Sequence, residues 1–161
     1  LNLDSSGAVS SSYPGSATNS IINLSDGPTA AWGGTNVIYA FAPVAGYSAF
    51  GSYTGNGSTD GAFVYTGFTP AFILLKRTDS GIRTWEIHDT ARSPGNVSEN
   101  NLIPNVSNAE SSGSARLDIL SNGFKLRDSG VGSNASGGTY IYCAWAEAPS
   151  VNLYGGGANA R

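Results

Sequence analysis

Residues 116–127 read RLDILSNGFKLR. An Asn-Gly pair between two apolar runs is the strongest short-range signal for a β-hairpin. Side chains alternate along a strand, so one face of this hairpin should collect its apolar residues and enter the core. Those residues are Leu117, Ile119, Phe124 and Leu126. The stretch therefore predicts two antiparallel strands with one shared buried face.

Other short apolar runs, bounded by Gly, Pro, Asn or Ser, lie on both sides of the hairpin and predict further strands. The run Phe72-Ile73-Leu74-Leu75 within 71–77 predicts a central strand, whereas 84–89 alternates and predicts one buried and one exposed face. With the hairpin, the total is eight or nine strands and no helix. The further expected strands are 37–42, 50–53, 62–65, 71–77, 84–89 and 140–147, with a short edge piece at 151–154.

The composition agrees with many short strands joined by polar loops. The 161 residues include 22 Gly, and only 12% are charged. Such a chain is poor in helix formers and rich in turn formers. We predict an all-β fold, an antiparallel two-sheet β-sandwich or jelly-roll, over residues 36–161. Residues 1–35, with one apolar patch at 21–24, are expected to be an extended N-terminal arm or linker, or a disordered tail.

Charge and cysteine content argue against several classes of protein. Eight basic residues against eleven acidic ones, with no basic run, do not favour binding to nucleic acid. No apolar stretch approaches the roughly 20 residues that span a bilayer, so membrane insertion is not expected. Cys143 is the single cysteine, which rules out an intrachain disulfide. Its apolar surroundings at 140–145 predict a small buried side chain.

No recognisable catalytic site emerges, and we predict that the protein is not an enzyme. His88 is the only histidine and no Gly-x-Ser-x-Gly elbow accompanies it, so we interpret it as a surface or half-buried structural residue. A glycosidase would need two carboxylates across a cleft. The candidate acids for this weakest alternative, a polysaccharide hydrolase, are Glu86, Asp118, Asp128 and Glu147.

No cofactor is predicted, although calcium stays open. One Cys and one His do not make a zinc site. Calcium accepts oxygen ligands, but no twelve-residue calcium-loop pattern occurs. The aspartates in or beside predicted loops are Asp60, Asp79, Asp89 and Asp128.

Aromatic side chains are the best candidates for a ligand or interface surface, because their rings stack on sugars and fill interface cores. The alternative is that they fill the core of the sandwich. The long polar segment 90–115 is either a functional or assembly loop or a mobile surface loop. The candidate aromatic residues are Tyr47, Phe50, Tyr53, Tyr65, Phe68 and Trp85.

From Gly46 onward, about 110 residues resemble a domain of tail-fibre and other virion proteins of marine bacteriophages. The resemblance implies a two-sheet sandwich like those of laminin-G and legume-lectin domains (concanavalin-like). It also implies a structural part of the virion whose distal regions bind host surfaces, and it carries over no catalytic residue. The matching stretches are 46–58, 60–61, 63–68, 70–72, 76–79, 89–92, 120–126 and 137–142.

We therefore expect a phage virion structural protein, a tail-fibre or surface-appendage domain located on the virion or outside the cell. It would form homo-oligomers or bind other virion proteins and display a host-recognition surface. Residues 1–35 would dock on a neighbour, adding a strand to an open sheet edge. The chain lacks coiled-coil heptads for a fibrous stalk, which leaves a capsid-decorating protein or an extracellular filament subunit open. The other alternative is a carbohydrate-binding, lectin-like module for a host-surface glycan.

Overall fold

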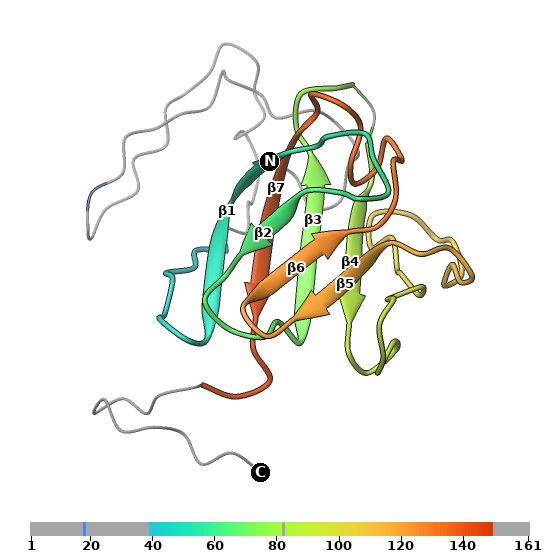
Figure 1. Cartoon of the computed structure of the whole chain (residues 1–161). Helices are drawn as coiled ribbons and strands as arrows, with labels where there is room; N and C mark the ends of the chain where they lie inside the picture. Colours follow the sequence, from blue (N-terminus) through green and yellow to red (C-terminus); the bar gives the residue numbers. More distant parts are fainter. Residues whose placement is uncertain (1–17, 19–38, 82, 150–161) are drawn as a thin grey trace.

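The computed structural model describes residues 18, 39–81 and 83–149. Within them the chain forms seven strands and no helix, arranged as two antiparallel sheets that face each other (Figure 1). The predicted all-β, two-sheet sandwich is confirmed. The predicted arm, apart from Thr18, and the predicted pieces at 21–24 and 151–154 lie outside the described residues.

The larger sheet has four strands in the order β1-β7-β3-β4, and β3 is an internal strand, as predicted. The smaller sheet has three strands in the order β2-β6-β5. The strands of the larger sheet are β1 (Ser48–Thr54), β7 (Thr139–Trp145), β3 (Phe72–Arg77) and β4 (Trp85–Asp89). Those of the smaller sheet are β2 (Phe63–Tyr65), β6 (Gly123–Leu126) and β5 (Leu117–Leu120).

The predicted hairpin is confirmed as β5 and β6. Leu117 lies opposite Leu126, and Ile119 lies opposite Phe124. Leu117, Phe124 and Leu126 are fully buried, and Ile119 packs against the same core. Burying each such side chain contributes on the order of 1.5–3 kcal/mol. The hairpin therefore supplies three of the nine residues in the buried core cluster, to which Val64 and Phe68 also belong.

The remaining core residues come from the inner face of the larger sheet. Ile73, Leu75 and Ala144 are fully buried and face the hairpin, and Tyr142 packs its ring edge-on against Phe124 at 5.5 Å. These positions alternate along β3 and β7, as they must when every second side chain points inward.

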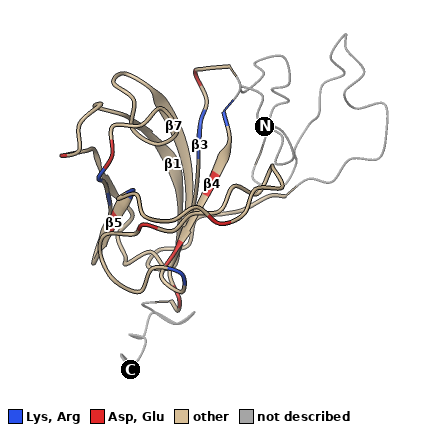
Figure 2. Ribbon diagram, turned by 90° about the vertical axis from the view of Figure 1, so that its right-hand side faces the viewer, with Lys and Arg blue, Asp and Glu red and all other residues tan. Residues whose placement is uncertain are grey.

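The outer face of the larger sheet is apolar as well. The register places Phe50, Cys143, Leu74 and Ile87 in one row across all four strands. Figure 2 shows β1 and β7 without a charged residue. Cys143 is half-buried here, not buried as predicted, because its position in β7 points away from the core. A sheet with apolar side chains on both faces is typical of a sheet whose two faces are both covered by other parts of a protein.

Two predicted elements differ from the structure. The predicted strand at 37–42 is not one, because the described part, Tyr39 to Ala42, is exposed and has no regular structure. β4 does not have one buried and one exposed face, because Trp85 is buried and Ile87 half-buried on its outer face. The following segment pairs with its free edge, where Leu102 bridges to Ile87 and the Trp85 amide donates to Asn105. His88 is fully buried, not at the surface, because it faces the inside opposite Ile73.

The long segment 90–116 contains no named strand but joins the two sheets along one side of the sandwich. It makes an isolated bridge to β4, between Leu102 and Ile87, and another to β5, between Ser98 and Leu117. Asn100 adds side-chain bonds to Arg92 and Ser93. The segment is therefore tied down at several points along its length.

Candidate functional site

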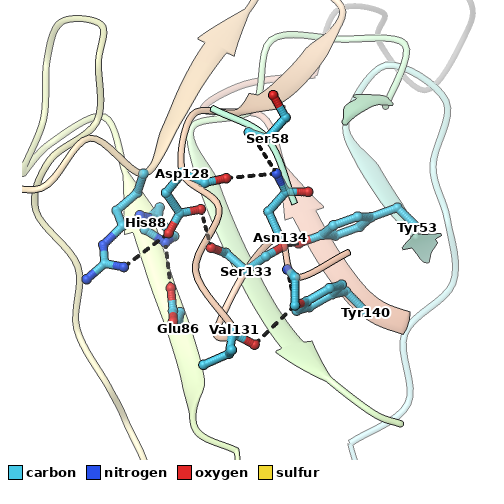
Figure 3. A network of polar contacts seen from close by, with 11 residues as sticks. Tyr53, Ser58, Glu86, His88, Asp128, Val131, Ser133, Asn134 and Tyr140 are labelled. Carbon is cyan, nitrogen blue, oxygen red and sulfur yellow. Dashed lines mark hydrogen bonds and ion pairs between the residues drawn. The ribbon is translucent and has the colours of Figure 1, made fainter. Parts of the chain in front are cut away.

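A network of polar side chains lies between the sheets, close to the loop that precedes β7 (Figure 3). Its centre is Asn134, which is fully buried. The Asn134 side-chain nitrogen donates to Asn56 Oδ1 at 3.0 Å and to the carbonyl oxygens of Ser58 and Asp128 at 2.8 Å each. Its Oδ1 accepts from the Asn56 amide at 3.0 Å. One side chain thus ties the loop after β1 to the segment between β6 and β7. We call this the inter-sheet network, and its other members are Tyr53, Glu86, His88, Ser133 and Tyr140.

Asp128 and the two tyrosines complete the connections around Asn134. The Asp128 carboxylate accepts from Ser133 Oγ at 2.5 Å and pairs with Arg116 at 3.2 Å. The Tyr53 hydroxyl donates to the Ser133 carbonyl at 2.7 Å. Burial raises the pKa of Tyr53 well above its usual value, so this phenol stays a hydrogen-bond donor. The Tyr140 hydroxyl donates to Val131 and accepts from the Ala135 amide.

Glu86 and His88 share the inner face of β4 and point toward the same loop (Figure 3). His88 Nε2 lies 3.4 Å from Glu86 Oε2, a distance suited to an ion pair, although the angles are not those of a hydrogen bond. Gly132 lies so close that a Cβ there would overlap Glu86 Oε1. The loop therefore lies directly against the Glu86 carboxylate, and a side chain at position 132 would require the end of Glu86 to move.

The inter-sheet network contains Ser, His, Asp and Glu, the residue types of nucleophilic catalysis, but their arrangement does not fit it. A nucleophilic serine must donate to its base, whereas Ser133 donates to Asp128. Ser133 and His88 are both at least 99% buried, so no substrate reaches them as the chain is folded. These groups hold loops together.

The candidate acids are not gathered at one cleft. Glu86 faces the interior, whereas Asp118 faces outward from the other sheet and pairs with Arg127 at 3.0 Å. Glu147 is exposed beyond the end of β7. Asp128 is the one candidate that belongs to the inter-sheet network with Glu86.

Each aspartate considered for calcium pairs with a basic side chain of the same chain. The pairs are Asp60–Lys125 at 2.5 Å, Asp79–Arg77 at 2.7 Å, Asp89–Arg92 and Asp128–Arg116 at 3.2 Å. In the described part of the chain, no group of three or more His, Cys, Asp or Glu is arranged to hold a metal ion. The oxygen atoms that calcium would need are thus spread over separate ion pairs.

The six candidate aromatic residues do not form one surface. Phe68 and Trp85 are buried, with the Lys76 ammonium 5.4 Å from the Trp85 ring centre. Tyr53 stacks on Tyr140 inside the sandwich at 5.0 Å. Tyr47, half-buried, lies in the turn before β1. Phe50 on β1 and Tyr65 on β2 lie on outer faces of the sheets without being buried, whereas Trp85 on the outer face of β4 is buried.

Phe50 belongs to an aromatic cluster on the outer face of the larger sheet. Its ring stacks on Phe41 at 5.7 Å, and both rings meet the Trp145 ring edge-on. Phe72 lies 5.6 Å from Trp145 on the other side. Phe41 is 60% exposed and the neighbouring Val44 is 51% exposed. The aromatic cluster, defined as Phe41, Phe50, Phe72 and Trp145, therefore reaches the protein surface.

Tyr65 belongs to a different surface, on the outer face of the smaller sheet. Phe63 and Tyr65 flank the buried Val64, so both rings point outward, with 48% and 67% of their surfaces exposed. Beside them the ion pairs Asp60–Lys125 and Asp118–Arg127 cross the same face. An open hollow of about 490 Å³ adjoins these ion pairs, because Asp60 and Arg127 are part of its lining. We call this surface the aromatic strip.

Phe41, Phe63, Phe72 and Trp145 are surface-cluster residues that sequence reasoning did not select. For Phe63 a signal exists, because a core-facing Val64 forces both of its neighbours outward. For the other three, the cluster depends on the pairing of β7 with β1 and β3, which no local pattern reveals.

A family described as Domain of unknown function (DUF7483) matches residues 1–149, so the chain belongs to this family. A search of curated proteins finds no match, and neither does a search of solved structures. Among the residues that the structure describes, no helix has the length and apolar character needed to cross a bilayer.

Proposed function

We propose that this chain is a self-assembling structural domain of a bacteriophage virion, a tail-fibre or surface-appendage component that displays a host-recognition surface. The support for a phage origin is the resemblance of about 110 residues, from Gly46 onward, to virion domains of marine phages. A compact sandwich without exposed catalytic groups among its described residues suits a display role.

The observation that carries the proposal is the aromatic cluster. Contiguous exposed apolar side chains on a soluble domain mark an interaction surface. Here Phe41 and Val44 stay exposed beside a sheet whose β1 and β7 strands carry no charge (Figure 2). Aromatic residues without charges are typical of the buried centre of an interface.

The partner that we propose for this face is a second copy of the chain. β1 is the outermost strand of the larger sheet, and within 39–81 and 83–149 only Val44 bridges to its free side. An open edge can accept a strand from another chain. Pairing there would cover Phe50, which is on β1, and Phe41, which stacks on it. One contact would then use both the edge and the aromatic cluster.

Light scattering on the purified full chain tests the assembly. We expect a homo-oligomer, and a Phe41→Ser/Val44→Ser double variant should shift toward the monomer because it removes the two exposed apolar side chains. Val131→Ser is the matched control, since Val131 is 56% exposed far from the aromatic cluster in sequence. A wild-type monomer at tens of micromolar would contradict the proposal.

Deleting residues 1–35 tests the proposed arm separately. Loss of the oligomer with an unchanged unfolding midpoint would support the arm as the assembly device. An oligomer that persists would assign assembly to the sandwich alone. For the virion location, mass spectrometry of purified particles of the encoding phage should detect the chain in a reproducible copy number, and its absence from particles would refute that part.

A second candidate, a carbohydrate-binding, lectin-like module, is favoured by the aromatic strip. The two functions are compatible, because a displayed virion domain needs a surface that recognises the host.

A further inference from the structure

We propose that the aromatic strip on the outer face of the smaller sheet binds a neutral oligosaccharide, with Tyr65 and Phe63 stacking on sugar rings. The proposal deepens the display role, since it names the recognition surface and the chemistry of its ligand. It uses the sheet opposite the one proposed for assembly, so the two can be tested independently.

The sheet directs both rings of the aromatic strip outward. Phe63 and Tyr65 are two residues apart on one strand, which places them on the same face about 7 Å apart. Tyr65 lies opposite Gly123 of β6. Because glycine has no side chain, the Phe63 ring lies over this position, with its Cε2 only 3.2 Å from where a Cβ of residue 123 would be. The two rings are therefore neighbours on the outer face, with 48% and 67% of their surfaces exposed.

Such rings present what a sugar ring needs. A pyranose has an apolar face made of C–H groups and a rim of hydroxyls, and aromatic side chains combine a large apolar surface with a low entropy cost of ordering. Exposing 67% of a tyrosine and 48% of a phenylalanine side by side leaves apolar surface that a protein otherwise buries.

Polar groups continue the aromatic strip along the sheet. Lys125 lies opposite Phe63 and pairs with Asp60 at 2.5 Å, and Asp118 lies opposite Lys125 and pairs with Arg127 at 3.0 Å. The Lys125 ammonium lowers the pKa of Asp60, so that carboxylate remains an acceptor. Ion pairs hold their side chains in place while leaving lone pairs and N–H groups for hydroxyls.

The charge balance identifies the class of sugar. Two carboxylates face two basic groups, so the polar part of the aromatic strip has no net charge. A strongly anionic polymer, such as a sulfated glycan or a nucleic acid, needs unpaired basic groups. A neutral glycan needs paired donors and acceptors, which this surface offers.

The dimensions suit a short oligosaccharide. From Tyr65 to Gly61 the strand direction covers about 13 Å, at about 3.3 Å per residue. The hollow of about 490 Å³ continues from there, because Asp60 and Arg127 belong to both its lining and the ion pairs. The rings, the ion pairs and the hollow thus form one continuous surface on a single face.

The test is binding of the full-length chain to an array of neutral gluco-, manno-, galacto- and xylo-oligosaccharides, with heparin fragments as the anionic probe. Calorimetry on the strongest neutral ligand then compares variants. Tyr65→Ala should weaken binding about tenfold or more, as removal of a stacking ring does for other ring ligands, whereas Tyr65→Phe should retain it. Tyr39→Ala is the matched control, because Tyr39 is equally exposed at 65% but lies outside both sheets.

Three outcomes would overturn the proposal: no binding to any neutral oligosaccharide, stronger binding to heparin, or an equal loss in Tyr65→Ala and Tyr39→Ala. Because both rings are exposed, the unfolding midpoint should not change. Light scattering on the same samples separates the two proposals. A Phe63→Ala/Tyr65→Ala variant that loses its oligomer would assign the aromatic strip to self-contact and would also refute glycan binding there.

Discussion

Replacing Asn134 by Ala is the most direct test of what holds the loops to the sandwich. Asn134 is fully buried, and its amide contacts four backbone or side-chain atoms contributed by Asn56, Ser58 and Asp128. Alanine removes all four contacts and leaves the carbonyl groups of Ser58 and Asp128 without the donor that Asn134 supplies.

The expected loss follows from the number of bonds. An amide has two N–H groups, so its three donor contacts include a shared one, and the side chain makes about three full hydrogen bonds. A net value of about 1 kcal/mol each predicts a loss of about 3 kcal/mol. No further cost is added, because Asn56 and Ser58 are exposed and water can replace the lost partner there. A loss of this size is a large part of the roughly 5–15 kcal/mol by which a domain is stable.

Urea denaturation, followed by tryptophan fluorescence, measures this change as a shift in the midpoint at constant slope. Asn108→Ala is the control, because Asn108 is exposed and its change should alter stability by less than about 0.5 kcal/mol. A loss below about 1 kcal/mol in Asn134→Ala would show that the inter-sheet network is not what closes this part of the sandwich.

Two further predictions concern the same region. Burial raises the pKa of Tyr53 above its usual 10.0, so above about pH 10 the unfolded chain binds fewer protons than the folded one, and stability should fall as the pH rises. Denaturation curves measured between pH 9 and 11, on the order of a unit either side of that value, should show that stability falls less steeply with pH in Tyr53→Phe than in the wild type. An equal fall in the two proteins would contradict the role given to Tyr53. Gly55→Ala should destabilise the chain by about 1–3 kcal/mol, since the new methyl group would overlap the backbone carbonyl oxygen of Ala135, which cannot turn away as a side chain can. Gly95→Ala is the control, because a Cβ at this position would meet nothing within 4 Å, and the denaturation midpoint should not change. A changed midpoint in this control would mean that replacing any loop glycine destabilises the chain, whatever its neighbours.

Local patterns predicted the strands well where the pattern and the pairing partner lie close together in sequence. The hairpin 116–127 contains its own turn and its own core face, so its register follows from the sequence. The segment 37–42 has similar apolar residues, but its described part pairs with no strand, and Phe41 instead lies on the ring of Phe50. Apolar side chains predict that a segment packs against other residues. Whether the segment is a strand depends on whether another strand lies beside it to pair with its backbone.

The sites were harder to predict because they depend on contacts between distant parts of the chain. Asn134 lies in a glycine-rich stretch that the sequence marks only as a loop, and its partner Asn56 is 78 residues away. Gly132 in the loop 128–134 lies against the carboxylate of the buried Glu86, and no alternation reveals that contact. Tyr65 was predictable as a surface residue, since its strand is only three residues long and Val64 fixes its direction.

The outermost strands have backbone partners on one side of the sandwich but not on the other. This difference affects where two copies of the chain could join. On one side the segment 90–116 bridges to β4 at Leu102 and to β5 at Ser98, so both outermost strands there already have a backbone partner. On the other side β1 and β2 are outermost, and within the described residues only Val44 bridges to β1. Proteins that stay monomeric usually cover or charge such edges, but β1 has no charged residue. Neither β1 nor β2 carries a charge, but β1 has seven residues against three in β2 and lies beside the aromatic cluster, so backbone pairing between copies would extend further along the β1 edge.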